Sequence, residues 1–526
     1  MRRISAATLR GLLVDQHELA LLDAREEGEF GAGHLFWAVP CPLSRREIRA
    51  RALLPRLGTR IVCVDDGSGL AERLAAWLES IGATDVAVLD GGTRAWEAAG
   101  QVLFSGVNVP SKAFGEWVER HFGTESVAPA DLEAWLEAGR DLAVLDSRTY
   151  DEFRAGTIPT AVNVPGGELL YRIADLVEDP ATPIVVTCAG RTRAILGAES
   201  LRRTGVPNRV LALRNGTMGW ELAGFRPERG RAQRFAPGRP RHAELALQRA
   251  KAFAEASGAG VIGPLDLTRF EADEDRSCYV LDVRDPAEFT AGHRPGSLSA
   301  PGGQLVQATD NWIAVRNARV ALVDDDGVRA RMAAAWLRQM GHRDVFVVEN
   351  GLADVIVPGT APVGVPELHA RLETITADTL AAAPNPTVID LARSLDFRAG
   401  HISGALWAVR TRLDVWADRL AAAGLVVLTS PDGMLARLTV KEATALTGAP
   451  VLVLEGGTAA WVRAGHRLEA DPANPPDAAC VDTHFRPSER STGIAAAMQA
   501  YLLWETGLLA EIERDGTVAF GVPEVG

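Results

Sequence analysis

The sequence has few cysteines and no long apolar run. Its five cysteines are scattered along 526 residues, and none of them forms a Cys-x-x-Cys pair. This spacing argues against a disulfide framework and against a zinc site. No stretch approaches the ~20 apolar residues that cross a bilayer, and the N-terminus lacks the apolar core of a secretory signal. We therefore expect a cytoplasmic location, where a free thiol stays reduced, and no metal and no membrane partner.

Basic residues are outnumbered by acidic ones, 55 to 68. The formal net charge is −13 at pH 7, so bulk electrostatics argues against nucleic acid as a partner. The apolar content of 47% is ordinary for a globular protein. Because 526 residues exceed what one hydrophobic core supports, the composition predicts several domains.

The chain repeats one pattern four times. Each copy opens with an apolar run ending in Asp, followed by an acidic residue, Phe and Gly, and closes with an apolar run and a Gly-containing turn. Three of the four turns are followed by Trp. The opening aspartates are Asp23, Asp146, Asp282 and Asp390, and the closing tryptophans are Trp96, Trp220 and Trp461.

Short β-branched runs alternate with amphipathic helical runs inside each copy. In the second copy the pattern predicts a strand over 184–187, a helix over 194–204 that ends at Gly205, and a strand over 209–213. Such alternation predicts a parallel sheet with helices on both faces.

The repeats and the segments between them define the predicted domains. The copies are assigned to residues 1–104, 124–228, 259–358 and 366–468, with a linker at 229–258, a short joint at 359–366 and a tail at 469–526. We expect one helix at 242–256 in the linker and another at 494–513 in the tail. The copies could pair within one chain, one with two and three with four.

Only the second copy has a cysteine where the buried strand ends. The positions equivalent to Cys188 are Asp65, Asp324 and Ser430. Ligands of parallel sheets bind at the carboxyl ends of the strands, where Cys188 falls. Free cysteines are usually core residues; we expect this of Cys63, and we expect Cys41 and Cys278 to be structural. The neighbouring glycine and arginines and the repeat context favour chemistry at Cys188.

The repeat resembles the rhodanese family, the sulfurtransferases that carry sulfur as a cysteine persulfide. Three features carry the resemblance together: Asp-x-Arg…Glu-Phe-x-x-Gly, the Cys-x-x-x-x-Arg loop at 188–193, and the Gly-Thr-x-x-Trp closing segment. The resemblance implies an α/β fold of four tandem rhodanese-like domains, each a parallel five-stranded sheet with helices on both faces. It also implies that Cys188 accepts sulfane sulfur from thiosulfate or a related donor and passes it to cyanide or a thiol, without a cofactor.

The resemblance extends to the residues after the cysteine. It implies that Ala189, Gly190, Arg191, Thr192 and Arg193 form the loop that binds the persulfide. This loop differs from the motifs usual in the two-domain thiosulfate and mercaptopyruvate enzymes, so the donor stays open. Cys480 in the tail stays open as a second sulfur carrier.

The residues around Cys188 are of types that stabilise a thiolate. A free thiol has a pKa of ~8.5 and is mostly protonated at neutral pH. We expect the helix N-terminus, Arg191 and Arg193 to lower the pKa of Cys188, and both guanidinium groups to bind the sulfonate end of thiosulfate. No general base is then required.

Other polar residues are predicted to support the fold. Asp146 and Arg148 recur in the first and third copies, so we interpret them as a bracing ion pair with a secondary role at the site. Glu168 follows a Pro-Gly-Gly turn that shapes the rim of the site. We expect Asp65 and Asp324 to fill the anion pockets of their own loops.

Two other functions stay open. A phosphatase or arsenate reductase of the same fold uses a longer Cys-x5-Arg loop, and the shorter loop here suits a single sulfur better. An interaction scaffold is the other alternative, because three copies lack the nucleophile and are free to bind a protein partner.

Overall fold

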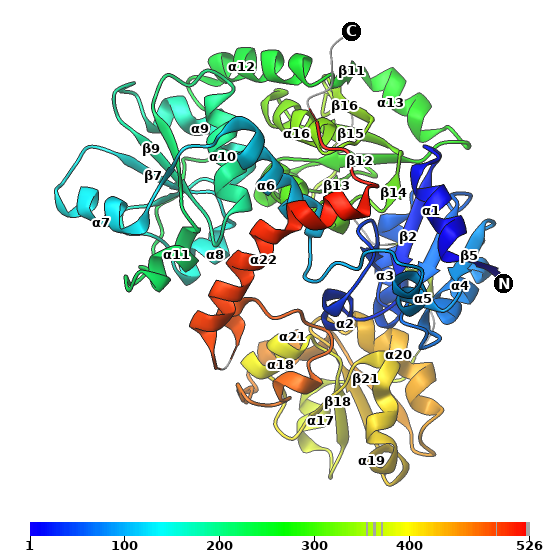
Figure 1. Ribbon diagram of the computed structural model, residues 1–526. Coiled ribbons are helices and arrows are strands. Elements are labelled where there is room, and N and C mark those ends of the chain that lie inside the picture. Colours follow the sequence, from blue (N-terminus) through cyan, green and yellow to red (C-terminus); the bar gives the residue numbers. More distant parts are fainter. Residues whose placement is uncertain (354–355, 361–363, 370–371, 491, 522–526) are drawn as a thin grey trace.

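The computed structural model describes residues 1–353, 356–360, 364–369, 372–490 and 492–521, so the joint at 359–366 lies partly outside the described residues. Each copy forms its own parallel sheet with helices around it (Figure 1). The strand order is the same in all four, with the first strand at one edge followed by the fifth, fourth, second and third. The prediction of four α/β domains with five-stranded parallel sheets is confirmed.

The strands are short, and the second and fourth strands of each sheet are largely buried. The first sheet contains β1 (Arg2–Ile4), β2 (Leu19–Asp23), β3 (Val39–Pro40), β4 (Ile61–Val64) and β5 (Val86–Leu89). The second contains β6 (Ser126–Val127), β7 (Ala143–Asp146), β8 (Val162–Asn163), β9 (Ile184–Thr187) and β10 (Val210–Leu213). The third contains β11 (Gly260–Ile262), β12 (Cys278–Asp282), β13 (Leu298–Ser299), β15 (Arg319–Val323) and β16 (Asp344–Val348). The fourth contains β17 (Thr374–Ile375), β18 (Thr387–Asp390), β19 (Leu406–Trp407), β20 (Val426–Thr429) and β21 (Val451–Leu454).

Helices connect the strands within each copy. The first two copies contain α1 (Ala6–Val14), α2 (Glu27–Ala32), α3 (Arg46–Leu53), α4 (Leu70–Ser80), α5 (Gly92–Ala98), α7 (Pro129–Glu137), α8 (Tyr150–Ala155), α9 (Leu169–Leu176), α10 (Thr192–Arg202) and α11 (Gly216–Leu222). The last two contain α13 (Pro264–Glu271), α14 (Pro286–Ala291), α15 (Gly302–Gln307), α16 (Val328–Gln339), α17 (Ala377–Ala382), α18 (Ser394–Ala399), α19 (Ala417–Ala421), α20 (Met434–Thr444) and α21 (Gly457–Arg463). Among the described residues, we find no helix with the length and apolar character needed to cross a bilayer.

Three longer helices lie outside the copies. They are α6 (Val109–Phe122), α12 (Ala243–Ala256) and α22 (Ile494–Asp515). The helices predicted in the linker and tail are confirmed, whereas α6 was not predicted. In Figure 1 α22 crosses the middle of the molecule beside α6. Its residues Leu508 and Ile512 join an apolar cluster with Phe104 and Val109, so the tail packs against the other domains.

The copies do not pair in sequence order. The second packs on the third where two Gly-Gly turns meet: a β-carbon on Gly167 would lie 2.8 Å from Gly303 N, and one on Gly303 would lie 2.7 Å from Gly167 N. The first pairs with the fourth through a buried ion pair in which Arg410 Nη1 lies 2.8 Å from Glu47 Oε2. The suggested pairing of copy one with two and of copy three with four is wrong. The close contact of the Gly-Gly turns joins the second copy to the third, and the buried Arg410–Glu47 ion pair joins the first to the fourth.

The third copy also extends the sheet of the first. Its strand β14 (Val315–Arg316) pairs antiparallel with β2, with Val315 opposite Ala20. The buried Tyr279 hydroxyl holds this strand, since it accepts from Ala314 N at 3.1 Å and Val315 N at 2.9 Å and donates to Leu53 O at 2.6 Å. The first sheet therefore has six strands, one of them from another domain.

Candidate active site

Cys188 lies in the turn between β9 and α10. The apolar strand places it at the carboxyl edge of the second sheet, where the thiol is 2% exposed. The backbone amides of Ala194 and Gly190 favour the anionic form of its sulfur and lower its pKa. The loop therefore surrounds one sulfur atom with amide donors, an arrangement that suits an anion at a helix N-terminus.

The other copies place their own side chains in the same amide pocket. Asp65 Oδ1 accepts from Gly67 N at 2.8 Å and its Oδ2 accepts from Ala71 N at 3.0 Å. Asp324 accepts likewise from Gly327 N and Ala330 N, at 2.7 and 3.0 Å. In each case, as for Cys188 and Ala194, the second donor lies six residues after the acceptor. The expectation that the aspartates fill their own pockets is confirmed.

The fourth copy follows the same geometry with a hydroxyl. Ala436 N lies 3.3 Å from Ser430 Oγ, again six residues later. All four loops thus place one polar side chain in equivalent positions, and only the second places a thiol there.

The closing Gly-Thr turn supports the loop from behind. Thr217 N donates to Cys188 O at 2.8 Å and Met218 N donates to Ala189 O at 3.0 Å. Gly216 has φ of +53°, and a β-carbon there would collide with the Cys188 carbonyl oxygen. This position accepts only glycine, which explains why the closing turn recurs with the loop.

Both loop arginines are paired with carboxylates. Arg193 Nη1 and Nη2 lie 2.7 and 2.8 Å from the two oxygens of Glu152. Arg191 Nε lies 2.6 Å from Glu116 Oε1, and its Nη2 contacts both Glu116 and Glu119 on α6. Neither guanidinium group presents a free fork to a sulfonate, so the expectation that both bind the sulfonate end of thiosulfate is wrong.

The pKa of the Cys188 thiol is raised above its ordinary value. Burial is the largest cause, and it outweighs Arg193 and the Ala194 and Gly190 amides, which lower the pKa. The expected lowering is therefore wrong for this arrangement. Sequence spacing revealed the cations and the helix end, but it could not reveal how completely the thiol is buried.

Residues far away in sequence cover the loop. Glu505 on α22 accepts from Lys112 Nζ at 3.1 Å, from Tyr501 Oη at 3.0 Å and from Thr192 Oγ1 at 3.3 Å. Burial opposes the charge of Lys112, but Tyr501 and Glu505 raise its pKa well above the ordinary value, so it stays a cation. Lys112, Tyr501 and Glu505 were not predicted, because neither α6 nor the tail belongs to a repeat.

Comparison with known proteins establishes the family. The Rhodanese-like domain family matches residues 5–99, 128–223 and 267–356, more than half of the chain. The chain belongs to the rhodanese-like domain family. The fourth copy lies outside the matched segments but has the same sheet order as the other rhodanese-like domains.

Individual relatives differ in their sequence identity to this chain and in the share of it that they cover. The crystal structure of a thiosulfate sulfurtransferase from Pseudomonas aeruginosa is 44% identical and has a TM-score of 0.94, with 100% of both chains covered. The Mycobacterium tuberculosis protein SseB, whose name assigns it provisionally to the thiosulfate sulfurtransferases, is 28% identical over 32% of this chain and 71% of its own length. An HTH-type transcriptional regulator of the same species is 33% identical over 20% of this chain, and the match covers 46% of the regulator.

The remaining predicted residues support the rhodanese-like folds. Arg148 Nη2 lies 2.6 Å from Asp146 Oδ2, and the same buried pair recurs at Asp282 and Arg284. In the second copy Thr157 Oγ1 donates to Asp146 Oδ2 at 2.7 Å. The interpretation of Asp146 and Arg148 as a bracing pair is confirmed.

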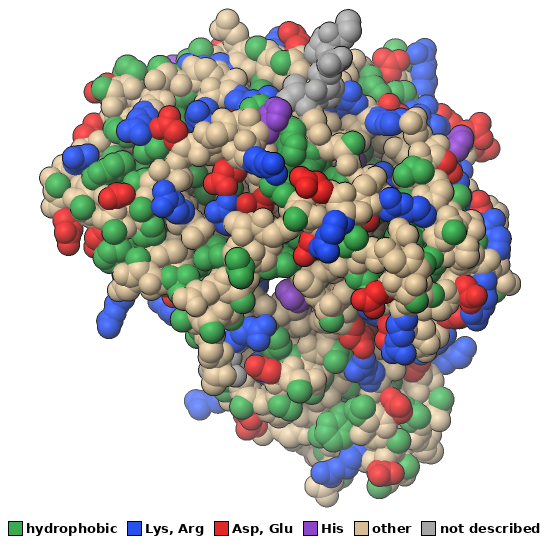
Figure 2. All heavy atoms as spheres, viewed as in Figure 1, with side chains coloured by type: hydrophobic (Ala, Val, Ile, Leu, Met, Phe, Trp, Pro, Cys, Tyr) green, Lys and Arg blue, Asp and Glu red, His purple; other side chains and the backbone are tan. Residues whose placement is uncertain are grey.

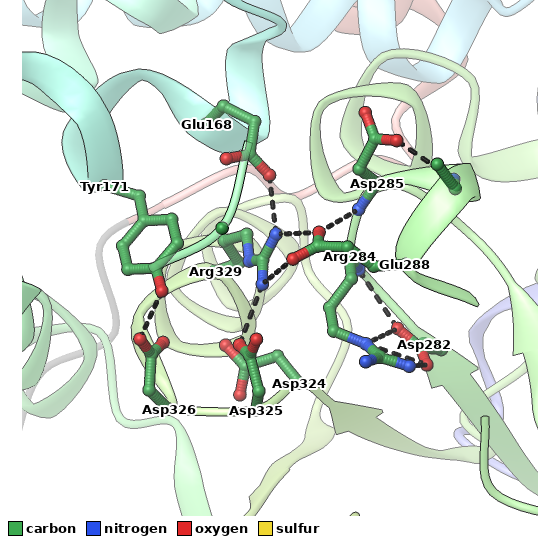
Figure 3. A network of polar contacts seen from close by, with 12 residues as sticks. Glu168, Tyr171, Asp282, Arg284, Asp285, Glu288, Asp324, Asp325, Asp326 and Arg329 are labelled. Atoms are coloured by element: carbon green, nitrogen blue, oxygen red, sulfur yellow. Dashed lines mark hydrogen bonds and ion pairs between the residues drawn. The ribbon is translucent and has the colours of Figure 1, made fainter. Parts of the chain in front are cut away.

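Glu168 connects two copies. Its Oε1 lies 2.8 Å from Arg329 Nη1 in the third copy (Figure 3). Its Oε2 lies 2.8 Å from Arg172 Nε in the second copy. Arg329 occupies the position of Arg193 and also pairs with Glu288 and Asp325. The contacts of Glu168 therefore join the second and third copies.

The other cysteines have structural surroundings. Cys41 and Cys63 are fully buried in the first copy, whereas Cys278 is partly exposed at the start of β12. Cys480 is buried in the tail, with Sγ 3.4 Å from Pro476 O. Only Cys188 combines a thiol with the amide pocket at the end of a central strand.

Proposed function

We propose that this protein is a sulfurtransferase that moves sulfane sulfur through a persulfide on Cys188. The observation that carries the proposal is the set of four equivalent loops. Two of them hold a carboxylate and one holds a hydroxyl against their amides, whereas the second holds a thiol. Similarity to the Pseudomonas aeruginosa thiosulfate sulfurtransferase over the full length supports the same conclusion.

The proposed reaction has two displacement steps. With thiosulfate as donor, the Cys188 thiolate attacks the outer sulfur, the sulfur–sulfur bond breaks, and sulfite leaves with the bonding pair. Cyanide or a thiolate then attacks the terminal sulfur of the persulfide and leaves as thiocyanate or a new persulfide, which regenerates the Cys188 thiolate. The amides of Gly190 and Ala194 stabilise the anionic sulfur in both steps.

Each loop residue has a proposed part in this reaction. Ala189, Gly190 and Thr192 supply backbone around the sulfur, while Arg193 stabilises the thiolate by its charge. Arg191 holds the loop against α6. The copies without cysteine brace the active one, and we propose a reducing compartment such as the cytoplasm, where the thiol stays free.

Intact mass after incubation with thiosulfate tests the proposal. Wild type should gain one sulfur atom and should release thiocyanate when cyanide is added, whereas Cys188→Ala should do neither. Cys63→Ala is the matched control, because Cys63 lies in the equivalent strand of the first copy. Turnover that persists in Cys188→Ala contradicts the proposal, and hydrolysis of an aryl phosphate by wild type favours the phosphatase alternative.

A further inference from the structure

The tail helix brings a carboxylate directly to the active-site loop. A β-carbon on Gly190 would lie 3.1 Å from Glu505 Oε2 and 3.2 Å from Tyr501 Cε1. Leu502 packs on the same side, in an apolar cluster with Met218 and Met498. Because Gly190 is two residues from Cys188, Glu505 lies next to the position where a substrate must meet the sulfur.

The two oxygens of Glu505 have different surroundings. Oε1 accepts three hydrogen bonds, from Lys112, Tyr501 and Thr192. Oε2 has no hydrogen-bond partner among the described residues. Water has little access to it, because the Glu505 side chain is only 1% exposed. Leaving a buried acceptor unsatisfied costs about 1–3 kcal/mol. The site therefore has an unmet requirement for a hydrogen-bond donor beside the loop.

The cations around the loop are already used. Arg191 pairs with Glu116 and Glu119, Arg193 pairs with Glu152, and Lys112 pairs with Glu505. Arg486 also pairs with Glu152, with Arg486 Nη1 3.7 Å from Glu152 Oε1, so four cations match the four carboxylates. These pairs leave no surplus positive charge for a dianion such as thiosulfate.

A groove runs along α22 beside Tyr501, and its lining includes neither Glu505 nor the Cys188 loop. It has a volume of 530 Å³, and its lining includes Gly31, Gly106, His484, Arg490, Tyr501 and Trp504. Figure 2 shows a hollow in this face, next to the course of α22 in Figure 1. The volume is that of a small-molecule site. Arg490 is exposed in the groove, whereas Glu505 is buried and bonded to the Tyr501 hydroxyl.

We infer that Glu505 determines donor specificity at the Cys188 site and selects an amine-bearing organic persulfide, such as that of cysteine. The ammonium group of the donor pairs with Glu505 Oε2, the buried oxygen that has no partner among the described residues. The Cys188 thiolate attacks the terminal sulfur, the sulfur–sulfur bond breaks, and the amino thiolate leaves and takes up a proton. This inference rests on the proposed function and narrows its donor from thiosulfate and related compounds to one chemical class.

Two donors that differ only in the amine provide the test. They are the persulfides of cysteine and of 3-mercaptopropionate, with thiosulfate as a third donor and cyanide as the acceptor. In wild type, kcat/KM should favour the amine-bearing persulfide by at least about tenfold, the effect of one charge-assisted hydrogen bond. Glu505→Gln should abolish that preference and raise kcat/KM for thiosulfate.

Controls separate specificity from folding and from loss of sulfur transfer. Glu513→Gln removes an exposed carboxylate from the same helix and should keep the wild-type preference. If Glu505→Gln unfolds, the Lys112→Gln/Glu505→Gln double variant removes both charges of the buried pair. The kcat/KM values for the three donors are then compared in that variant. A preference for the amine that survives both substitutions overturns the inference while leaving the sulfurtransferase intact. Failure of wild type to form a Cys188 persulfide with all three donors overturns the proposed function itself.

Discussion

Arg191 in the Cys188 loop is paired with Glu116 on α6, with Arg191 Nε 2.6 Å from Glu116 Oε1. The side chains are 11% and 4% exposed, so the pair lies in the interior. It ties the loop of the second domain to a helix that precedes that domain. Burial raises the pKa of Glu116, and the hydrogen bond and positive charge of Arg191 lower it. The charged form of Glu116 is therefore stabilised mainly by Arg191.

Removing one member of this pair should loosen the loop. Arg191→Met leaves Glu116 buried without its cation and should cost about 3 kcal/mol of local stability. Faster amide hydrogen exchange in α6 and α10 would report the loss. The Arg191→Met/Glu116→Leu double variant should recover most of the protection, because two apolar side chains replace the pair. Equal exchange in the single and double variants would mean that the two residues do not act together.

The raised pKa of Cys188 predicts the pH dependence of its reactivity. A thiol is unreactive when protonated, so the alkylation rate should keep rising with pH beyond the ~8.5 of a free thiol. Arg193→Gln should move the profile to higher pH, because Arg193 lowers the pKa. Mass spectrometry of the Cys188 peptide after iodoacetamide treatment measures the rate. A plateau already reached at neutral pH would contradict the burial effect.

Gly216 should be irreplaceable. Gly216→Ala places a β-carbon against the Cys188 carbonyl oxygen at a φ of +53°, which costs about 1–2 kcal/mol in backbone strain before any collision. We expect loss of thiocyanate formation and a lower Tm. Gly224→Ala is the matched control, since Gly224 also has a positive φ but open space around it. Similar activity in the two variants would show that the contact with the loop is unimportant.

Tyr279 should hold the first and third copies together. Tyr279→Phe leaves the amides of Ala314 and Val315 without their acceptor and should cost about 2–3 kcal/mol. Hydrogen exchange at β14 and β2 should increase, while persulfide formation on Cys188 should not change. Tyr150→Phe, on the partly exposed ring that stacks on Phe153, serves as the control. Unchanged protection at β14 would exclude the hydroxyl as its anchor.

Local patterns were sufficient to predict the repeated fold. The apolar runs that end at Asp23, Asp146, Asp282 and Asp390 became the second strand of each sheet, and the predicted strand at 184–187 has the same bounds as β9. Helix α10 begins at Thr192 and ends at Arg202, two residues before the predicted bounds at each end. Strand period, helix period and turn residues act over a few positions, so one chain segment contains the information.

Cys188 was predicted as the reactive residue from the repeat, but the contacts around it were not predicted. The substitution of Asp65, Asp324 and Ser430 at the equivalent positions pointed to one working thiol. The pairing of the copies, the partners of Arg191 and Arg193, and the raised thiol pKa depend on which surfaces meet after folding. Desolvation and charge pairing are set by atoms far apart in sequence, such as Glu505 beside Gly190, and no local pattern encodes them.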